Sequence, residues 1–189
     1  MLSLLDPVQL PSSQSNVSGF RLSLLYGECV DFAGFDIGLV GCATSDFHGL
    51  SIGGVNIVSR RLVGIQVGLV NENSNGDDSS ARRSIGVQYG FLNYVDSLLG
   101  LQDGWINTSS GNVSGLQYGF LNCAADVNGV QCGSLLVLGV NVAVGSVSGC
   151  QIGIVNYAGR MESGAQIGLV NIIANGGFFP ALPIVNGGF

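Results

Sequence analysis

The chain has 189 residues, of which 47% are hydrophobic and only 10% are charged, and its formal net charge is −6. Disordered chains show the opposite balance, so this composition excludes ordinary disorder. Lysine is absent, and among the arginines only Arg60–Arg61 and Arg82–Arg83 form adjacent pairs. Because no basic face can follow a phosphate backbone, we expect no nucleic-acid partner.

The apolar runs are too short for a transmembrane helix. Glycine, asparagine or a charge interrupts each of them well before the roughly 18 residues that such a helix requires. The N-terminal stretch from Met1 to Leu5 is short and lacks a basic start, so it does not have the pattern of a secretory signal. Either the chain is not exported or a signal has been removed, and the sequence leaves both open.

Five cysteines stand at positions 29, 42, 123, 132 and 150. The odd number and the absence of a Cys-x-x-Cys pair argue against a complete disulfide framework and against a zinc site. Cys132 and Cys150 occupy repeat positions that Val67 and Ile65 hold elsewhere. We therefore expect these two cysteines to be small buried hydrophobic residues.

Residues 1–18 precede the first repeat and contain Pro7 and Pro11, so we expect an N-terminal cap there. Residues 19–175 repeat a unit of about fifteen residues whose most regular form is Gly-x-Gln-x-Gly-Leu-Val-Asn. The leading glycines fall at 19, 34, 49, 64, 86, 100, 115, 129, 149 and 164. In the unit that begins at Gly64, apolar residues alternate with glycine and glutamine, which is the period of a β-strand. A fixed short period of this kind indicates a repeat architecture.

Two steps between leading glycines are longer than fifteen residues and predict insertions near residues 72–84 and 134–138. The first begins Asn71-Glu-Asn-Ser-Asn-Gly-Asp-Asp78, which is similar to the start of a calcium loop with oxygen ligands at alternating positions. Asparagine replaces the early aspartates, and Arg82 stands where the loop needs a glutamate. A solvated polar loop is therefore favoured, and we predict no metal site.

Residues 176–189 contain Phe178, Phe179 and two prolines, and they are the candidate for a C-terminal cap that covers the last strand edge. A terminal Phe189 is also what a barrel of the bacterial outer membrane carries, which keeps a second architecture open.

Two architectures fit the repeat: a β-solenoid with parallel coils, and an antiparallel β-barrel of the outer-membrane type. Parallel stacking brings the repeat asparagines into one column, where their amides can hydrogen-bond along the stack. It also aligns the glycines at bends, where a positive φ or a close approach of the backbone favours glycine. In a barrel the same asparagine would alternate between the two rims. We therefore predict an all-β parallel β-solenoid of about ten 15-residue coils with end caps, and the barrel is the alternative.

The glutamine column is expected to form a polar ladder on the outside of the solenoid, either for hydrogen bonding along the stack or as an uncharged face for a ligand. This column comprises Gln66, Gln88, Gln102, Gln117, Gln131, Gln151 and Gln166. Aromatic residues cluster in mid-chain and are expected to pack in the core, with a membrane girdle as the alternative. They are Tyr89, Phe91, Tyr94, Trp105, Tyr118 and Phe120.

The repeat resembles that of the bacterial "surface repeat" proteins first labelled in leptospires. The resemblance is carried by the Gly-x-Gln-x-Gly-Leu-Val-Asn units and by the divergent first copy that begins at Gly19, and it covers residues 19–186. It implies an exported or surface location in a bacterium, and it carries over no catalytic residue.

Few residues suit catalysis. His48 is the only histidine and stands just before a repeat glycine, where a surface turn residue is expected. Carboxylates are scattered singly apart from Asp77–Asp78, and a phosphate-binding loop cannot occur without lysine. We therefore predict no enzyme, no catalytic residue, no cofactor and no metal.

The predicted function is that of a structural or interaction module of a bacterial surface or envelope. A small outer-membrane pore or anchor is the alternative. The predicted location is the bacterial cell surface, the outer membrane or the medium. The partner is unknown from sequence: self-association, a protein, a glycan and a membrane all remain open.

Overall fold

The computed structural model describes residues 1–5, 8–74, 83–134 and 139–189. It is a parallel β-solenoid of about nine turns, with 81% strand and no helix in these ranges. The predicted fold class is confirmed, and the antiparallel barrel is excluded because successive repeat strands pair in parallel. The described ranges contain no helix with the length and apolar character needed to cross a membrane.

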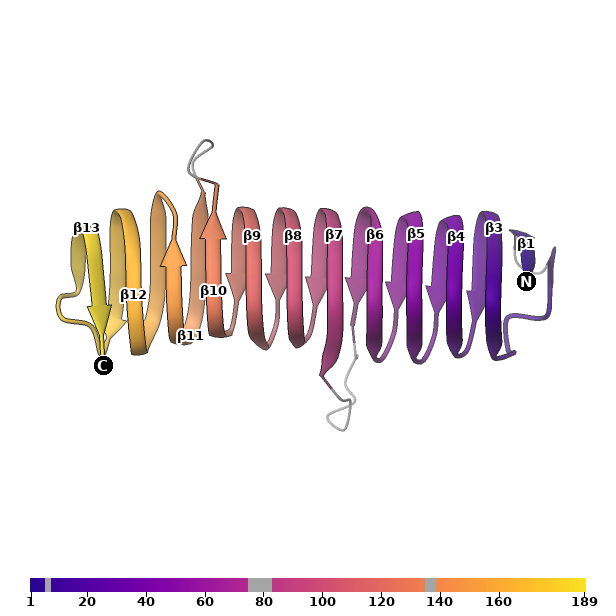
Figure 1. Ribbon diagram of the computed structural model, residues 1–189, viewed down its shortest axis with the longest axis horizontal. Coiled ribbons are helices and arrows are strands. Elements are labelled where there is room, and N and C mark those ends of the chain that lie inside the picture. The colour runs from indigo at the N-terminus through magenta and orange to yellow at the C-terminus, as the bar shows by residue number, and fades with distance from the viewer. Residues whose placement is uncertain (6–7, 75–82, 135–138) are drawn as a thin grey trace. The chain divides into compact units, whose positions relative to one another are not determined.

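The chain divides into two compact units, Met1–Asp96 and Ser97–Phe189, which we call unit 1 and unit 2. Unit 1 contains β1 (Leu2–Leu5), β2 (Val8–Leu10), β3 (Val17–Cys29), β4 (Phe32–Ala43), β5 (Phe47–Val58), β6 (Leu62–Asn73) and β7 (Ser84–Val95). Strands β3 to β7 follow one another as parallel coils (Figure 1). At the N-terminus, β1 pairs in parallel with β3 and antiparallel with β2.

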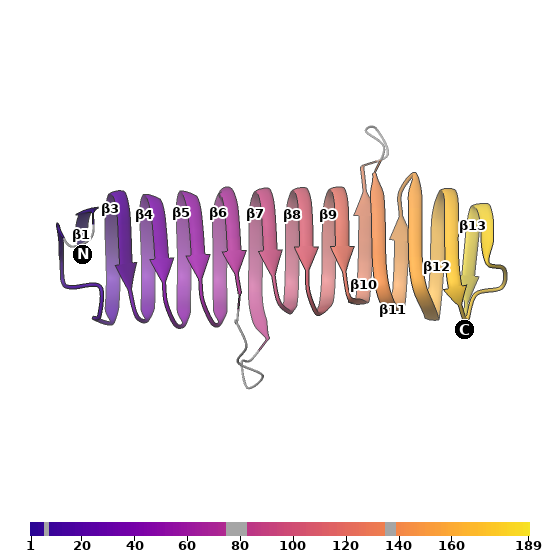
Figure 2. The same cartoon turned by 180° about the vertical axis from the view of Figure 1, so that it is seen from behind.

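Unit 2 contains β8 (Leu98–Ser109), β9 (Asn112–Ala124), β10 (Asp126–Gly133), β11 (Val140–Ile152), β12 (Val155–Asn175) and β13 (Ala181–Gly188). Strand β10 ends early, and the start of β11 completes its coil by pairing with the end of β9. Strand β13 lies antiparallel to β12 at the C-terminal end of the unit (Figure 2).

The two predicted insertions lie between β6 and β7 and between β10 and β11. Residues 75–82 and 135–138 are outside the described ranges, and with them lie Asp77, Asp78 and Arg82 of the calcium-like sequence. The described start of that sequence belongs to the solenoid itself. Asn71 is fully buried in β6, and the Nδ2 of Asn73 donates to the main-chain oxygens of Val58 and Arg60.

The leading glycines stand in register along the stack and have positive φ, from +96° at Gly19 to +152° at Gly86. At most of these positions a side chain would collide with the coil before it: a Cβ on Gly149 would overlap the main-chain oxygen of Gly129. The sequence-based prediction of aligned glycines at bends is therefore confirmed. Both φ and close approach of the backbone demand glycine.

The apolar core lies near the turns between coils, where residues at the end of one strand and at the start of the next are buried. In unit 1 it comprises Val17, Cys29, Phe32, Ala43, Phe47, Val58 and Leu62. In unit 2 it comprises Val113, Ala124, Val127, Ala143, Val147, Ala158, Met161 and Ile173. The buried rings of Phe32 and Phe47 stack at 5.1 Å between centroids, as in-register coils allow. This apolar column fills only half of the interior, and polar side chains fill the other half.

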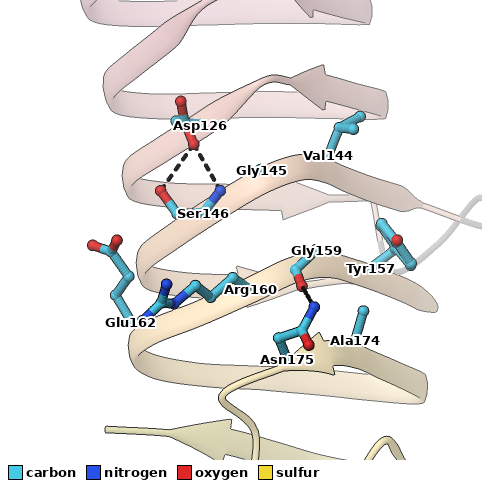
Figure 3. A pocket seen from close by; sticks show the side chains of 10 residues that line it. All are labelled: Asp126, Val144, Gly145, Ser146, Tyr157, Gly159, Arg160, Glu162, Ala174 and Asn175. Atoms are coloured by element: carbon cyan, nitrogen blue, oxygen red, sulfur yellow. Dashed lines mark hydrogen bonds between the residues drawn. The ribbon is translucent and has the colours of Figure 1, made fainter.

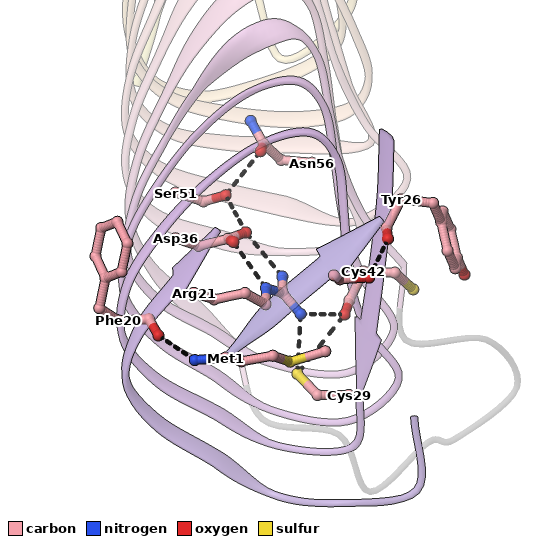
Figure 4. Close-up of polar contacts among 10 residues, drawn as sticks. Met1, Phe20, Arg21, Tyr26, Cys29, Asp36, Cys42, Ser51 and Asn56 are labelled. Carbon is pink, nitrogen blue, oxygen red and sulfur yellow. Dashed lines mark hydrogen bonds and ion pairs between the residues drawn. The ribbon is translucent and has the colours of Figure 1, made fainter. Parts of the chain in front are cut away.

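At the N-terminal end of unit 1 a buried ion pair occupies the position of the repeat glutamine (Figure 4). The Nε and Nη2 of Arg21 donate to the two carboxylate oxygens of Asp36, each at 2.7 Å, and Nη1 donates to the main-chain oxygen of Cys42 at 2.9 Å. Burial alone would lower the pKa of Arg21, but the hydrogen bonds and charge of Asp36 raise it above its ordinary value. A Cβ on Gly41 would contact both charged groups. Glycine therefore replaces the repeat asparagine here because the ion pair fills that space.

Replacing Asp36 by alanine is expected to destabilise unit 1 by about 3–5 kcal/mol, because it leaves the Arg21 guanidinium buried without its counter-charge. Urea unfolding followed by circular dichroism measures the change. Adding Arg21→Gln should recover part of the loss, since the unpaired charge is then gone. Asp46→Ala, a carboxylate outside the ion pair in the same unit, is the control and should change little. Equal losses in the single and double variants would show that the charge is not the cause.

Candidate functional site

The glutamine column lies inside the solenoid, so the prediction of an outward ladder is wrong. The glutamines from Gln66 to Gln166 are each 0% exposed. From Gln117 to Gln166, each Nε2 donates to the Oε1 of the glutamine one coil earlier, at 2.7–2.8 Å. The same nitrogen also reaches a main-chain oxygen across the interior, as from Gln151 to Tyr157 at 3.0 Å. Most of these amide groups therefore have a partner within the protein; the exceptions among the described residues are the Nε2 of Gln66 and the Oε1 of Gln166, in the first and last glutamines of the column. A polar group that is hydrogen-bonded can be buried at little cost.

The asparagines form a second buried ladder, as predicted from parallel stacking. In unit 2 the Nδ2 of Asn107 donates to the Oδ1 of Asn122, and the pattern continues to Asn171 at 2.7–2.9 Å. Each donation runs toward the C-terminal coil, whereas the glutamine donations run toward the N-terminal coil. The amide dipoles of the two columns therefore oppose one another, so the interior gains hydrogen bonds without accumulating a large net dipole.

The two ladders show that the strand limbs face each other across a narrow interior. Gln151 bonds the backbone beside Asn156, and Asn156 bonds the backbone beside Gln166, at the main-chain oxygen of Ile167. Side chains alternate along a strand. The residues on either side of each buried amide must therefore point outward.

This alternation places apolar columns on the outside of unit 2. Wall A holds the neighbours of each glutamine: Leu101, Asp103, Leu116, Tyr118, Val130, Cys132, Cys150, Ile152, Ala165 and Ile167. Wall B holds the neighbours of each asparagine: Ile106, Thr108, Leu121, Cys123, Val140, Val142, Val155, Tyr157, Val170 and Ile172. The ridge between the walls holds Trp105, Phe120, Ile154 and Leu169, each three residues after a glutamine. All of these side chains are exposed or half-buried.

The aromatic residues lie on these outer surfaces, so the prediction of an aromatic core is wrong. Trp105 is 57% exposed on the ridge and Tyr118 is 47% exposed on wall A. In unit 1, Tyr89 and Phe91 are likewise exposed. The ring of Trp105 lies 6.3 Å from that of Phe120 in the next coil, so neighbouring aromatic residues cover each other only in part.

Unit 1 follows the same plan. The outward columns around its buried amides are apolar, with Phe20, Ile37, Ile52, Ile65 and Leu69 among the exposed residues. Two carboxylates, Glu28 and Glu72, interrupt the wall next to the asparagine column. Unit 2 therefore carries the more continuous apolar surface.

Charged groups in unit 2 gather on the opposite side, which we call the polar edge. It is formed by Ser110, Asp126, Asn128, Ser146, Ser148, Arg160, Glu162 and Asn175. Three of the four charged side chains of unit 2 lie there and line an open hollow of about 510 Å³ (Figure 3). In it, Asp126 accepts hydrogen bonds from the main-chain and side-chain donors of Ser146 at 2.7 and 2.8 Å. The fourth, Asp103, lies on wall A, where desolvation raises its pKa.

His48 lines a second hollow of about 410 Å³ in unit 1, together with Ser18, Asp31 and Asp46. A nucleophile and its base must lie within about 3 Å of each other. Ser18 and His48 occupy one column separated by Ala33, so their backbones are two strand spacings apart, about 9.6 Å. The carboxylate of Asp31 accepts the main-chain N–H of Asp46 at 3.1 Å. The arrangement does not assemble a Ser-His-Asp triad.

The cysteines divide by position. Cys29 and Cys42 are buried, whereas Cys132 and Cys150 are half-buried on wall A, so the expectation that these two lie in the core is wrong. Desolvation raises the pKa of all five thiols, and that of Cys29 rises to about 11. Thiolate, the nucleophilic form, is therefore scarce at neutral pH. In the described ranges, no group of three or more His, Cys, Asp or Glu residues could hold a metal ion.

No protein-family model matches the chain, and neither a curated protein nor a solved structure is significantly similar to it. The resemblance to the surface repeat proteins therefore stays a prediction. The two apolar walls, the ridge and the polar edge are the features that bear on function.

Proposed function

We propose that the chain is a non-enzymatic interaction module of a bacterial surface or envelope, and that its outer apolar walls are the interacting surface. One observation carries the proposal: amides fill the interior while leucine, isoleucine, valine and aromatic side chains point outward. Soluble proteins rarely expose contiguous apolar patches of more than a few hundred Å² unless these bind something.

The non-enzymatic part of the proposal is supported by the chemistry of the two hollows. The hollow at His48 separates the candidate nucleophile from the base, and the thiols are held in their protonated form by burial. The polar hollow of unit 2 contains Asp126, Arg160 and Glu162, but its carboxylate at Asp126 is already engaged by Ser146. The repeat resemblance supports the bacterial surface or envelope as the location.

Site-directed photocrosslinking in a bacterium that produces the chain tests this proposal. A benzophenone side chain at Tyr118 on wall A should form an adduct with an envelope component. The same group at Asn128, an exposed residue of the polar edge, is the control and should form far less. Absence of an adduct at Tyr118, or equal adducts at both positions, would contradict a specific role for the walls.

A further inference from the structure

The exposed surface of unit 2 is divided into an apolar part and a charged part. The two walls and the ridge carry a single ionisable carboxylate, Asp103, besides weakly acidic thiol and phenol groups. Asp126, Arg160 and Glu162 lie together on the polar edge. Division of this kind makes a structure amphipathic about its long axis, which is the property that keeps an amphipathic helix in a membrane interface.

The backbone of the coils is suited to contact with hydrocarbon. An unpaired N–H or C=O group is costly in lipid, so lipid-facing structures must satisfy their backbone internally. In unit 2, β9 to β12 pair with neighbouring strands, so their main-chain hydrogen bonds run along the stack. The walls therefore present side chains outward, and their main-chain groups are bonded to adjacent coils.

The size of the apolar surface favours a lipid layer over a second protein as its partner. One wall of unit 2 measures about five strand spacings by about four residues, or roughly 300 Å². A stable protein interface needs about 800 Å² from each partner. A second copy of the chain packed against one flat wall would fall short of this area, and it would leave the ridge and the other wall in water. A hydrocarbon layer covers both walls and the ridge at once.

Charge also indicates which lipid surface fits. The walls and ridge of unit 2 contain no arginine, and the only arginine of the unit lies on the polar edge. With a net charge of −6 for the chain, anionic headgroups offer no electrostatic attraction. The complementary surface is therefore uncharged hydrocarbon beneath zwitterionic headgroups.

We infer that unit 2 binds a lipid bilayer in the plane of its interface, with the ridge residues Trp105, Phe120 and Leu169 in the acyl region and the polar edge in water. This inference depends on the proposed function, because it names the envelope component that the walls contact. It places Trp105, the only tryptophan, at the deepest part of the bound surface.

Vesicles of phosphatidylcholine test the inference with the purified full chain diluted from a mild detergent. We expect the protein to float with the vesicles, its tryptophan emission to shift to the blue, and lipids brominated in the acyl chain to quench that emission. Binding should change less than about twofold between low and high salt, because it does not depend on surface charge. Binding that requires anionic lipid and disappears in salt would overturn the inference.

Two matched substitutions locate the bound surface. Leu169 on the ridge is 64% exposed, and Val144 beside the polar hollow is 71% exposed (Figure 3). Leu169→Glu should weaken binding about tenfold or more, since a fully buried leucine contributes that much to transfer out of water. Val144→Glu introduces the same charge and should leave binding unchanged. Leu169→Ser is the second ridge variant, and circular dichroism confirms that each variant is folded.

Equal weakening by Leu169→Glu and Val144→Glu would contradict the orientation. Sedimentation equilibrium without lipid checks the second copy: a dimer that Leu169→Glu dissociates, together with no vesicle binding, would overturn the inference in favour of self-association. A negative vesicle result with a positive adduct to an envelope protein at Tyr118 would overturn the lipid partner and leave the proposed function standing. If vesicle binding and crosslinking at Tyr118 are both negative, the lipid partner and the proposed function are both contradicted.

Discussion

Replacing Gly149 by alanine is expected to destabilise unit 2 by more than about 4 kcal/mol, which is the range of exceptional single substitutions. Gly149 has φ +142°, and its Cβ would overlap the main-chain oxygen of Gly129 in the neighbouring coil. That oxygen belongs to the strand pairing between β10 and β11, so it cannot retreat without separating two coils. Thermal unfolding by circular dichroism, combined with hydrogen exchange, measures the loss and locates it.

Gly19→Ala separates the two causes of this effect. Gly19 also has a positive φ, +96°, but no atom lies within 4 Å of the place where its Cβ would stand. The backbone strain alone should cost about 1–3 kcal/mol. If Gly149→Ala and Gly19→Ala lose equal stability, the backbone conformation is the dominant effect, and the close approach between coils is not.

The strand period, the parallel stacking and the register of the coils could all be predicted from the repeat. The asparagine is the reason: a polar residue at one fixed place in most units is favoured only where identical residues meet, which parallel stacking provides. The aligned glycines gave the same answer independently. These features depend on local chemistry that recurs in most units, so one sequence contains many copies of the signal.

The face predicted to be interior was the wrong one, because hydrophobicity was taken as the sign of burial. Alternation defines two faces but does not say which is inside. The glutamine column was placed outside on polarity alone, although amides that hydrogen-bond to one another along a ladder can be buried with little cost in stability.

A signal for the correct assignment was present in the glycines. Gly64 and Gly68 stand on the same side of the strand as Gln66, and this small-large-small pattern recurs in most units. A Cβ on Gly68 would contact the Nδ2 of Asn56, so the glycine allows the asparagine ladder to pass. An exposed column would not require two glycines per unit. The outer walls, and hence the candidate interaction surface, could have been found from this pattern.

The ion pair of Arg21 and Asp36 could not be inferred as a pair from the repeat. Both residues stand in the glutamine column, and if that column lay outside they would be ordinary surface charges. Only their burial shows that they end the amide ladder, and that Gly41 replaces asparagine to make room for them. Such substitutions depend on one another across coils, whereas the repeat pattern treats each unit separately.

Replacing Asn122 by alanine is expected to destabilise unit 2 by about 3 kcal/mol or more, because unsatisfied buried polar groups cost about 1–3 kcal/mol each. Its Nδ2 donates to the Oδ1 of Asn141 at 2.9 Å and to the main-chain oxygen of Cys132 at 3.1 Å, and its Oδ1 accepts from Asn107 at 2.8 Å. Urea unfolding measures the loss. The matched control is Asn175→Ala. Asn175 is exposed, and its Nδ2 donates a hydrogen bond to the main-chain oxygen of Gly159 at 3.2 Å, so this substitution should cost under about 0.5 kcal/mol.

Asn122→Asp distinguishes a lost hydrogen bond from a lost volume, because aspartate has nearly the same shape. Its carboxylate can still accept from Asn107, but it cannot donate to Asn141, and burial would raise its pKa above that of an unfolded aspartate. The folded state then binds a proton more tightly than the unfolded state, so stability should be lowest at neutral pH and should rise as pH falls through the folded pKa. The alanine variant has no such group and should show no comparable gain. A pH-independent loss in Asn122→Asp, equal to that of the alanine variant, would mean that packing rather than the direction of the amide ladder holds the coils together.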